Sequence, residues 1–351
     1  MKKNFKIGQT KIGNGEKCFI VAELSGNHAG NLKRAKKLIL EAKKAGADAV
    51  KLQTYTADTI TLNSNNKDFK IKESSPWKRK KNLWSLYKEA HTPWKWHKPL
   101  FLYAKKIRIE IFSSPFDESA VNLLEKLKCP AYKIASAEIN HIPLLEKVAK
   151  TKKPVILSIG LATKQDILLA IKTLKDNGCT KIIVLQCVSE YPAKNKDQNL
   201  GLIQRIKKDF NVISGLSDHT IGPTAAMTSA IIGGSVIEKH FNLKDKVKTV
   251  DSFFSMKNTN FAKMVKLIRE AESCIGKNNY KYISSKVKNI NSRRSIYASA
   301  DIKKGEKFTS KNIQVVRPGL SLHPKYFSHL LKKKTKKNLK KGSRIYLKHT
   351  K

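Results

Sequence analysis

Eight short apolar runs alternate along the chain with amphipathic segments of helical periodicity. Each run ends in polar residues, and the runs are Cys18–Leu24, Ala49–Thr54, Ile109–Pro115, Ala131–Ser136, Pro154–Gly160, Lys181–Cys187, Val212–Asp218 and Ser235–Phe241. Between them lie segments such as Leu32–Ala45 and Gln165–Asn177, whose apolar residues recur at helical spacing. Strands that alternate with helices in this way favour a parallel sheet, and eight such units predict an α/β fold, a (β/α)8 TIM barrel.

The polar residues that end the runs gain importance in such a barrel. The C-terminal ends of all eight strands open on one shared pocket, so residues distant in sequence converge there. Side-chain alternation in the second run places Lys51 and Gln53 on one face and Leu52 on the other. The side chains predicted to meet at this end of the barrel are Glu23, Lys51, Gln53, Ser114, Lys133, Ser136, Ser158, Ser217, His219 and His240.

The length and a late change of pattern predict a second, smaller domain. The chain has 351 residues, whereas a minimal barrel needs about 250. Beyond the segment Asn260–Ile275 the chain changes to short strand-like runs separated by Gly and Asp turns. We therefore expect a catalytic barrel over residues 1–276, a linker over 277–290 and a small domain over 291–351. Within the barrel, Tyr55–Trp94 is too long for an ordinary connection and predicts a functional excursion above the barrel mouth.

Composition restricts the class of protein. The chain contains no apolar run long enough to span a membrane and no signal-peptide pattern, so we expect a soluble, cytoplasmic protein. The five cysteines lack the spacing of a zinc site and are expected to be reduced thiols. The formal net charge of +44 comes almost wholly from lysines spread over the chain. This pattern predicts a lysine-coated surface that attracts anionic small substrates, with no specific nucleic-acid partner.

Two histidines and two lysines carry the candidate chemistry. His219 and His240 end neighbouring strands, where two imidazoles can share a divalent ion or can simply be hydrogen-bonded at the barrel top. Lys51 and Lys133 lie within apolar runs, near several serine hydroxyls, and this combination suits the binding of phosphate and carboxylate groups.

Two carboxylates and a rival mechanism complete the candidate chemistry. Glu23 and Glu138 are candidates for acid–base work or sugar binding, and a salt bridge to one of the lysines is an equal alternative. A Schiff-base mechanism through a barrel lysine is a further alternative.

Taken together, the motifs resemble the sialic acid synthase family over nearly the full length of the chain. The matching segments are AELSGNHAG, AVKLQTY, FSSPFD, YKIASAE, LSIGLAT, QCVSEYPA, GLSDHTIGP, IEKHF and VDSFFS. The C-terminal segment RRSIYASADIKKGEKFTSKNIQVVRPG resembles the family's SAF domain, which is related to type III antifreeze proteins.

The resemblance implies a synthase of nonulosonic acids that joins phosphoenolpyruvate to the open-chain aldehyde of an N-acetylated amino sugar, with loss of phosphate by C–O cleavage. It further implies a homodimer in which each SAF domain completes the partner's active site. A divalent ion, Mn or Mg, would be held by His219 and His240 and would activate the aldehyde. Phosphoenolpyruvate would be held by Lys51, Ser114, Lys133, Ser136, Ser158 and Ser217. Sugar contacts would come from Glu23, Gln53, Ser189, Tyr191, Asp251 and, from the partner's SAF domain, Arg317, while Glu138 would position or deprotonate water.

Two departures from the sialic acid pattern indicate the substrate. AELSGNH replaces the usual Ile-Gly-Val-Asn-His form, and Ser189 stands where an Asn is usual. Both resemble the branch of the family that makes pseudaminic acid from 2,4-diacetamido-2,4,6-trideoxy-altrose. The alternatives are N-acetylneuraminate or legionaminate synthesis and, in a different class, a non-catalytic carbohydrate-binding protein.

Overall fold

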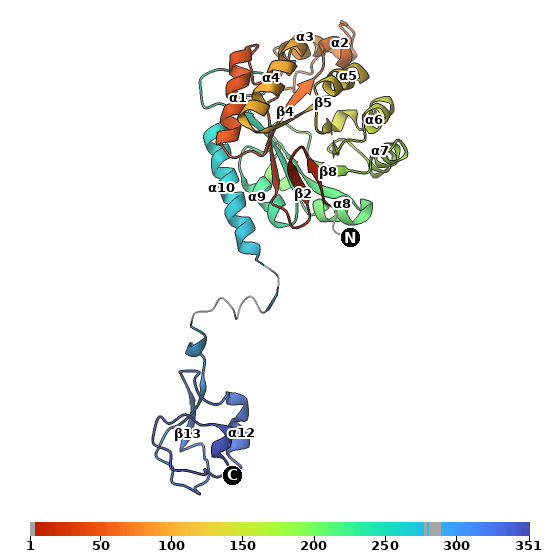
Figure 1. The fold of residues 1–351 in the computed structure, drawn as a ribbon. Coiled ribbons are helices and arrows are strands. Elements are labelled where there is room, and N and C mark those ends of the chain that lie inside the picture. The colour runs from red at the N-terminus through yellow and green to blue at the C-terminus, as the bar shows by residue number, and fades with distance from the viewer. Residues whose placement is uncertain (1–3, 277–278, 281–288) are drawn as a thin grey trace. The chain divides into compact units, whose positions relative to one another are not determined.

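A computed structural model describes residues 4–276, 279–280 and 289–351 of the chain. The chain divides into two compact units, residues 1–275 and 276–351, and each is described by itself (Figure 1). Most of the linker expected over 277–290 lies outside the described residues. Within the described ranges, no helix has the length and hydropathy that a membrane crossing requires.

The first unit is a closed barrel of eight parallel strands, which confirms the predicted fold. Pairing runs in chain order from β3 to β10, and β10 pairs with both β3 and β9, so the sheet has no free edge among these eight strands. Their bounds are β3 Phe19–Glu23, β4 Ala49–Thr54, β5 Glu110–Pro115, β6 Tyr132–Ile134, β7 Val155–Ser158, β8 Ile182–Cys187, β9 Ile213–Asp218 and β10 Val236–Asn242. Each lies inside or within one residue of a predicted run.

Helices surround the strands and bury one apolar face each against them (Figure 1). They are α1 Leu32–Lys44, α4 Trp94–Ile107, α5 Glu118–Lys126, α6 Ile142–Ala149, α7 Lys164–Asp176, α8 Leu202–Phe210, α9 Thr224–Ile231 and α10 Asn258–Ile275. Helix α1 shows why these segments are helical. Asn31 caps it by accepting a hydrogen bond from the backbone N–H of Arg34, and its buried residues Leu38, Ile39 and Ala42 recur at helical spacing.

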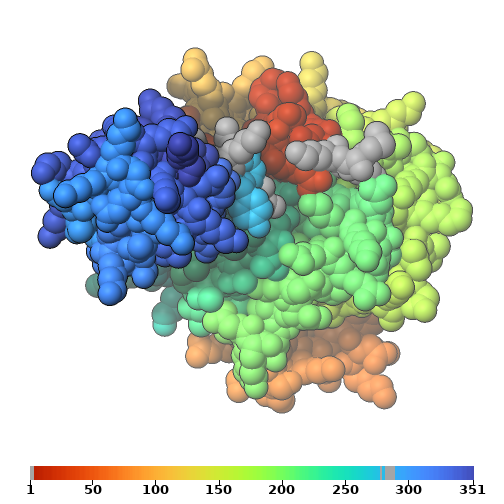
Figure 2. All heavy atoms as spheres, turned by 90° about the horizontal axis from the view of Figure 1, so that it is seen from below, coloured from red at the N-terminus to blue at the C-terminus, as the bar shows by residue number. Residues whose placement is uncertain are grey.

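An N-terminal hairpin, which the sequence pattern did not reveal, precedes the barrel. Strands β1 Asn4–Ile7 and β2 Thr10–Gly13 pair antiparallel. Ile7 and Ile12 are fully buried and belong to the same apolar core as the barrel strands. Figure 2 shows red atoms from the start of the chain beside green atoms of the later barrel helices. The hairpin was missed because four-residue strands carry too little periodicity to be recognised.

Three connections between barrel elements bear on the site. The excursion after β4 contains two short helices, α2 Ala57–Ile60 and α3 Leu83–Ala90, and the 3-10 turn η1 Lys67–Phe69. Further 3-10 turns follow β6, η2 Ser136–Glu138, and β8, η3 Asn195–Asp197. After β10, residues 243–255 form a loop of bends and turns that we call the β10 loop, and the two-residue strand β11 Met256–Lys257 follows it.

The second unit has its own small core. Strands β12 Ser295–Ala298 and β13 Ile313–Val316 pair antiparallel, and the helix α12 Phe327–Leu330 packs with them. Among residues 289–351, the remaining elements are the 3-10 turns η4 Ile290–Ser292, η5 Pro324–Tyr326 and η6 Leu347–His349. Eight buried apolar residues, Ile296, Phe308 and Leu330 among them, form a cluster separate from the barrel core. The unit therefore has what a domain needs to fold around its own interior.

Candidate active site

Strand register brings the predicted residues to the same level of the barrel. His240 on β10 pairs with Glu23 on β3, and Glu23 pairs in turn with Lys51 on β4. On the other side of β10, Glu238 pairs with Ser217 of β9. Side chains at matching levels of adjacent parallel strands lie close together, so the register itself assembles the site.

A buried ion cluster lies at the centre of this level. The Lys51 ammonium is 2.7 Å from Glu23 Oε2 and 3.2 Å from Glu238 Oε1, and Lys133 Nζ is 3.5 Å from the same Glu238 oxygen. All four side chains are at most 5% exposed. The salt bridge that the sequence left as an alternative for Glu23 is thus formed, with Lys51.

The cluster shifts the pKa of each member. Burial alone would lower the pKa of Lys51, but the carboxylates of Glu23 and Glu238 outweigh it and raise that pKa. Burial lowers the pKa of Lys133 and raises that of Glu23. In each case the opposite charges nearby shift the pKa the other way, but burial has the larger effect. Glu238 faces both ammonium groups, which overcome its burial and lower its pKa. Two lysine amines placed together in this way can bind a multiply charged anion when it displaces their carboxylate partners.

Hydroxyl groups surround the ion cluster. Lys51 Nζ donates to Ser114 Oγ at 3.2 Å, and Ser217 Oγ donates to Glu238 Oε1 at 3.3 Å. Ser136 Oγ accepts the backbone N–H of Gly160 at 3.0 Å, whereas the buried Ser158 hydroxyl has no protein partner. A buried hydroxyl without a partner costs free energy unless something else binds it, so Ser158 is a candidate ligand-binding group.

His219 and His240 face each other across the ends of β9 and β10, with ring centroids 5.5 Å apart. His219 Nδ1 donates to the Val188 carbonyl at 2.8 Å, which leaves its Nε2 as the coordinating atom. Nδ1 of His240 is buried without a partner, and burial, His219 and Lys51 lower the pKa of this imidazole, so it is neutral. Within the described residues, no third His, Cys, Asp or Glu joins them in a metal cluster. The pair therefore fits an ion that takes its other ligands from water and substrate.

Above the ion cluster lies a cavity of about 580 Å³. Its wall combines side chains from the excursion after β4, from the turn after β6, from the segment after β8 and from the β10 loop. Apolar and aromatic groups of the excursion, Ile60, Leu83 and Tyr87 among them, form much of one side. A volume of this size accommodates a small metabolite the size of an amino sugar.

The predicted residues fall into three groups. The cavity wall includes Gln53, Ser136, Glu138, Ser189, Tyr191, His240 and Asp251. Beneath it, buried and outside the wall, are Glu23, Lys51, Ser114, Lys133, Ser158, Ser217 and His219. Neither Lys51 nor Lys133 lines the cavity, and the carboxylates of Glu23 and Glu238 bind both ammonium groups. Arg317 belongs to the second unit, where it is exposed and lines a groove with Tyr297 and Lys341.

Two carboxyl groups of the wall are poorly hydrated. Burial raises the pKa of Glu138 to about 7 despite the nearby charge of Lys133, and Glu138 Oε2 has no protein partner. Burial likewise raises the pKa of Asp251 to about 7. Groups that titrate near neutrality in a cavity are suited to accept or donate protons there.

Sequence reasoning missed three residues of the site. Glu238 is two positions before His240 on β10, so the alternation of strand side chains would have placed both on the same face. Trp77 and Phe254 belong to an aromatic group over the histidines: Phe254 lies 4.6 Å from His240 and 4.9 Å from Tyr191, and Trp77 lies 5.8 Å from Tyr191, between ring centroids. No periodic signal marks these two aromatics, because both lie in irregular loops.

Comparison with known proteins identifies the family of this chain. Residues 38–280 match the NeuB family, and residues 293–349 match the SAF domain. The pseudaminic acid synthase of Campylobacter jejuni is 44% identical over 94% of this chain and 96% of its own length. That of Helicobacter pylori is 44% identical over 92% of this chain and 94% of its own. A solved structure of N-acetylneuraminic acid synthetase from Leptospira borgpetersenii is 30% identical, with a TM-score of 0.72 over 81% of this chain and 96% of that one.

The family match covers more than half of the chain, and the two synthases extend the similarity over nearly all of it. These findings confirm the resemblance that the motifs indicated, including the C-terminal SAF domain. The chain belongs to the NeuB family and carries a C-terminal SAF domain.

Proposed function

We propose that this chain is a synthase of pseudaminic acid, which condenses phosphoenolpyruvate with the open-chain form of 2,4-diacetamido-2,4,6-trideoxy-altrose. The observation that carries the proposal is the 44% identity to pseudaminic acid synthases over nearly the whole of both chains. The site supports it, because a buried pair of lysines among hydroxyls lies beneath a cavity with apolar walls. The methyl groups of a diacetamido deoxy sugar suit such walls better than additional hydroxyls would.

Phosphoenolpyruvate would bind at the lower level, on Lys51 and Lys133. Their ammonium groups would exchange the carboxylates of Glu23 and Glu238 for the phosphate and carboxylate of the substrate. The hydroxyls of Ser114, Ser136, Ser158 and Ser217 would donate to the remaining oxygens. Gln53, Ser189, Tyr191 and Asp251 would hold the sugar in the cavity with its aldehyde toward the histidines.

Bond formation would proceed from the enol. Carbon 3 of phosphoenolpyruvate attacks the aldehyde carbon, and the cation left at carbon 2 is captured by water. Loss of phosphate by C–O cleavage then gives the 2-keto acid, so one water is consumed for each phosphate released. A divalent ion, Mn or Mg, on His219 and His240 would supply Lewis acidity toward the aldehyde oxygen. Glu138 would take the proton from the attacking water, for which its raised pKa suits it.

We further propose a cytoplasmic homodimer in which Arg317 of each SAF domain completes the sugar site of the other subunit. Arg317 is exposed on its own unit, in a groove that also contains Lys341 and Tyr297. A guanidinium in such a position can bind a carboxylate or an amide oxygen of a molecule held by another surface.

The experiment that tests the function is phosphate release from phosphoenolpyruvate in the presence of Mn. We expect turnover with the diacetamido altrose and none with N-acetylmannosamine. Turnover with N-acetylmannosamine alone, or with the legionaminate precursor alone, would assign the chain to another branch. A chelator should abolish the activity and added Mn should restore it, whereas borohydride should leave no sugar or pyruvate adduct on Lys51 or Lys133, which excludes an imine.

A further inference from the structure

The β10 loop supplies the sugar end of the cavity without regular structure of its own. Val250, Asp251 and Phe254 of this loop line the cavity. All residues of the loop are described, and none of them belongs to a helix or strand. The position of these cavity side chains therefore depends on what holds the loop from outside.

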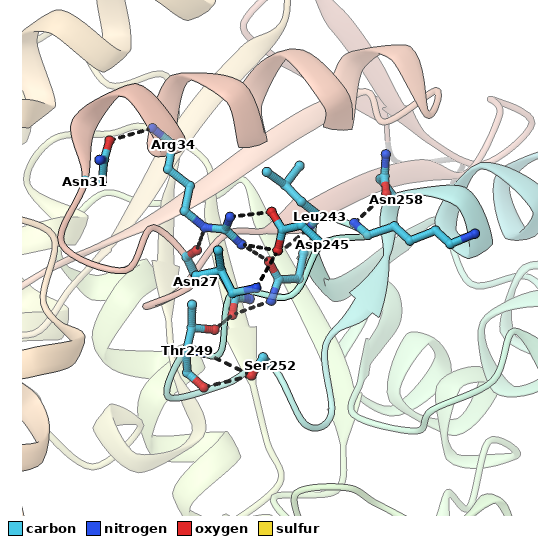
Figure 3. Close-up of polar contacts among 11 residues, drawn as sticks. Asn27, Asn31, Arg34, Leu243, Asp245, Thr249, Ser252 and Asn258 are labelled. Atoms are coloured by element: carbon cyan, nitrogen blue, oxygen red, sulfur yellow. Dashed lines mark hydrogen bonds and ion pairs between the residues drawn. The ribbon is translucent and has the colours of Figure 1, made fainter.

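Arg34, in the first turn of α1, binds the beginning of the loop (Figure 3). Its Nε donates to the Asn27 carbonyl at 2.8 Å, and one terminal nitrogen donates to Asn242 Oδ1 at 2.9 Å. Both terminal nitrogens reach the Asp245 carboxylate, at 2.5 and 3.3 Å. The Arg34 side chain is 11% exposed, and its guanidinium lowers the pKa of Asp245. A bidentate ion pair of this kind fixes the orientation of Asp245 relative to α1 as well as its distance.

Asn27, in the turn between β3 and α1, binds the end of β10 and two residues of the loop, Ser255 and Thr249, the second of which is labelled with it in Figure 3. Its amide nitrogen donates to the Phe241 carbonyl at 3.0 Å and to Ser255 Oγ at 2.9 Å. Its amide oxygen accepts from Asn242 Nδ2 at 3.2 Å and from the Thr249 hydroxyl. The side chain is fully buried and uses both donor hydrogens and both acceptor sites, so no isosteric residue can reproduce it.

The same turn also holds the cavity face of the loop. The Ser25 hydroxyl donates to the Asp251 carboxylate, and the Gly26 N–H approaches the same oxygen at 3.4 Å. Ser255, which Asn27 binds, donates its hydroxyl to the Asp251 carbonyl at 2.6 Å. A Cβ atom at Gly26 would lie 2.5 Å from Val250 Cγ2, so a larger residue in the turn would clash with the loop. Hydrogen bonds thus connect Arg34 to Asn27, Asn27 to Ser255, and Ser255 to the Asp251 carbonyl.

We propose that Arg34 and Asn27 are positioning residues for the sugar half of the reaction. They hold the β10 loop so that Asp251 and Phe254 meet the amino sugar, whereas phosphoenolpyruvate binds on the lysines below and does not depend on them. The proposal rests on the proposed function only in naming the sugar as the occupant of the cavity. Its signature is a change in the KM for the sugar without a matching change in the KM for phosphoenolpyruvate.

The kinetic test compares Arg34→Gln, Asp245→Asn and their double variant with the wild-type protein. We expect each single variant to raise the KM for the sugar roughly tenfold and to leave the KM for phosphoenolpyruvate within about twofold. The double variant should be no worse than Arg34→Gln alone, because Arg34→Gln already removes the contact with Asp245. Arg34→Lys should raise the KM for the sugar less than Arg34→Gln does, because an ammonium keeps the charge but cannot make the paired hydrogen bonds of the guanidinium. Arg205→Gln is the matched control, because it breaks an exposed Arg–Asp pair on α8.

An optical test does not require turnover. The indole N–H of Trp77 donates to the Val250 carbonyl of the loop at 2.8 Å, so a released loop should expose Trp77. Acrylamide should quench the tryptophan fluorescence of Arg34→Gln more strongly than that of the wild-type protein. This increase should disappear when both proteins also carry Trp77→Phe. Asn27→Asp, which removes two donor hydrogens, should give the same increase if it folds.

Three results would overturn the proposal. One is an equal rise in both KM values. Another is a lowered melting temperature with both KM values unchanged, which would make the contacts purely structural. The third is an unchanged Trp77 signal in Arg34→Gln. If the wild-type protein turned over none of the sugars, the proposed function would fail, while the quenching test would still decide whether Arg34 holds the loop.

Discussion

Glu138 combines burial, an unpaired oxygen and a place in the cavity wall, and in the proposed mechanism it accepts the proton of the attacking water. Because its pKa is raised to about 7, the reactive carboxylate is lost as pH falls through neutrality. We expect the wild-type rate to fall below pH 7 and expect Glu138→Gln to lose about a hundredfold or more in kcat at pH 8. Phosphate release between pH 5.5 and 8.5 measures both. Glu190→Gln, on the exposed segment after β8, is the control and should keep the wild-type profile.

The same carboxyl group should also reduce stability. Its folded pKa of about 7 exceeds that of an unfolded glutamate, so the folded state binds the extra proton between these values. The unfolding free energy therefore falls as pH rises through this window, and the full cost is present above pH 7. We expect Glu138→Gln to raise the unfolding free energy by about 3 kcal/mol at pH 8 and hardly at all at pH 4. Urea titrations at both pH values test this, and equal effects at the two would contradict it.

At the scale of elements, the excursion after β4 acts as a wall of the cavity and not as a mere connection. Trp77 contacts Tyr191 and Phe254 and bonds to the β10 loop, so it joins three of the segments around the cavity. Trp77→Ala should raise the KM for the sugar about tenfold, or about 1.4 kcal/mol, with little effect on phosphoenolpyruvate. Trp84→Ala is the matched control, because Trp84 bonds to Asp58 and does not line the cavity. An equal effect of the two substitutions would argue against a specific role for Trp77.

The elements that sequence predicted well are those with strong periodicity. Each barrel strand was found within a residue or two, because a buried parallel strand is a continuous apolar run and its polar end falls at the rim. The same logic brought Glu23, Lys51 and His240 to one level, as the register shows. Glu238 was overlooked because it adjoins Lys239 in sequence and resembles one half of a local ion pair. In the structure Lys239 instead pairs with Asp218 on β9, at 2.7 Å.

The irregular parts could not be predicted in the same way. Trp77 and the β10 loop take their positions from contacts with residues far away in the chain, such as Asn27 and Val250. Neither hydrophobic period nor turn chemistry encodes such contacts. The excursion was recognised only by its length, which indicated a function without indicating which side chains perform it.

At the scale of the whole molecule, the question is why a complete barrel carries a second unit. The barrel already holds the ion cluster, the histidines and the cavity, whereas the SAF unit carries several exposed arginines, of which Arg317 lines a groove of that unit. If Arg317 of each SAF unit binds substrate in the neighbouring subunit, a symmetric dimer completes both of its active sites.

Subunit complementation tests whether Arg317 acts in the active site of the partner subunit or in that of its own chain. Arg317→Ala leaves the barrel intact, and His219→Ala leaves the SAF unit intact, so each homodimer should have little or no activity. After the two are mixed and allowed to exchange subunits, half of the dimers are mixed, and in each of these the intact barrel meets an intact partner Arg317. About a quarter of the wild-type activity should return. If Arg317 acted on its own barrel, or if the protein were a monomer, mixing would restore nothing, because no molecule would then contain both intact parts of one site.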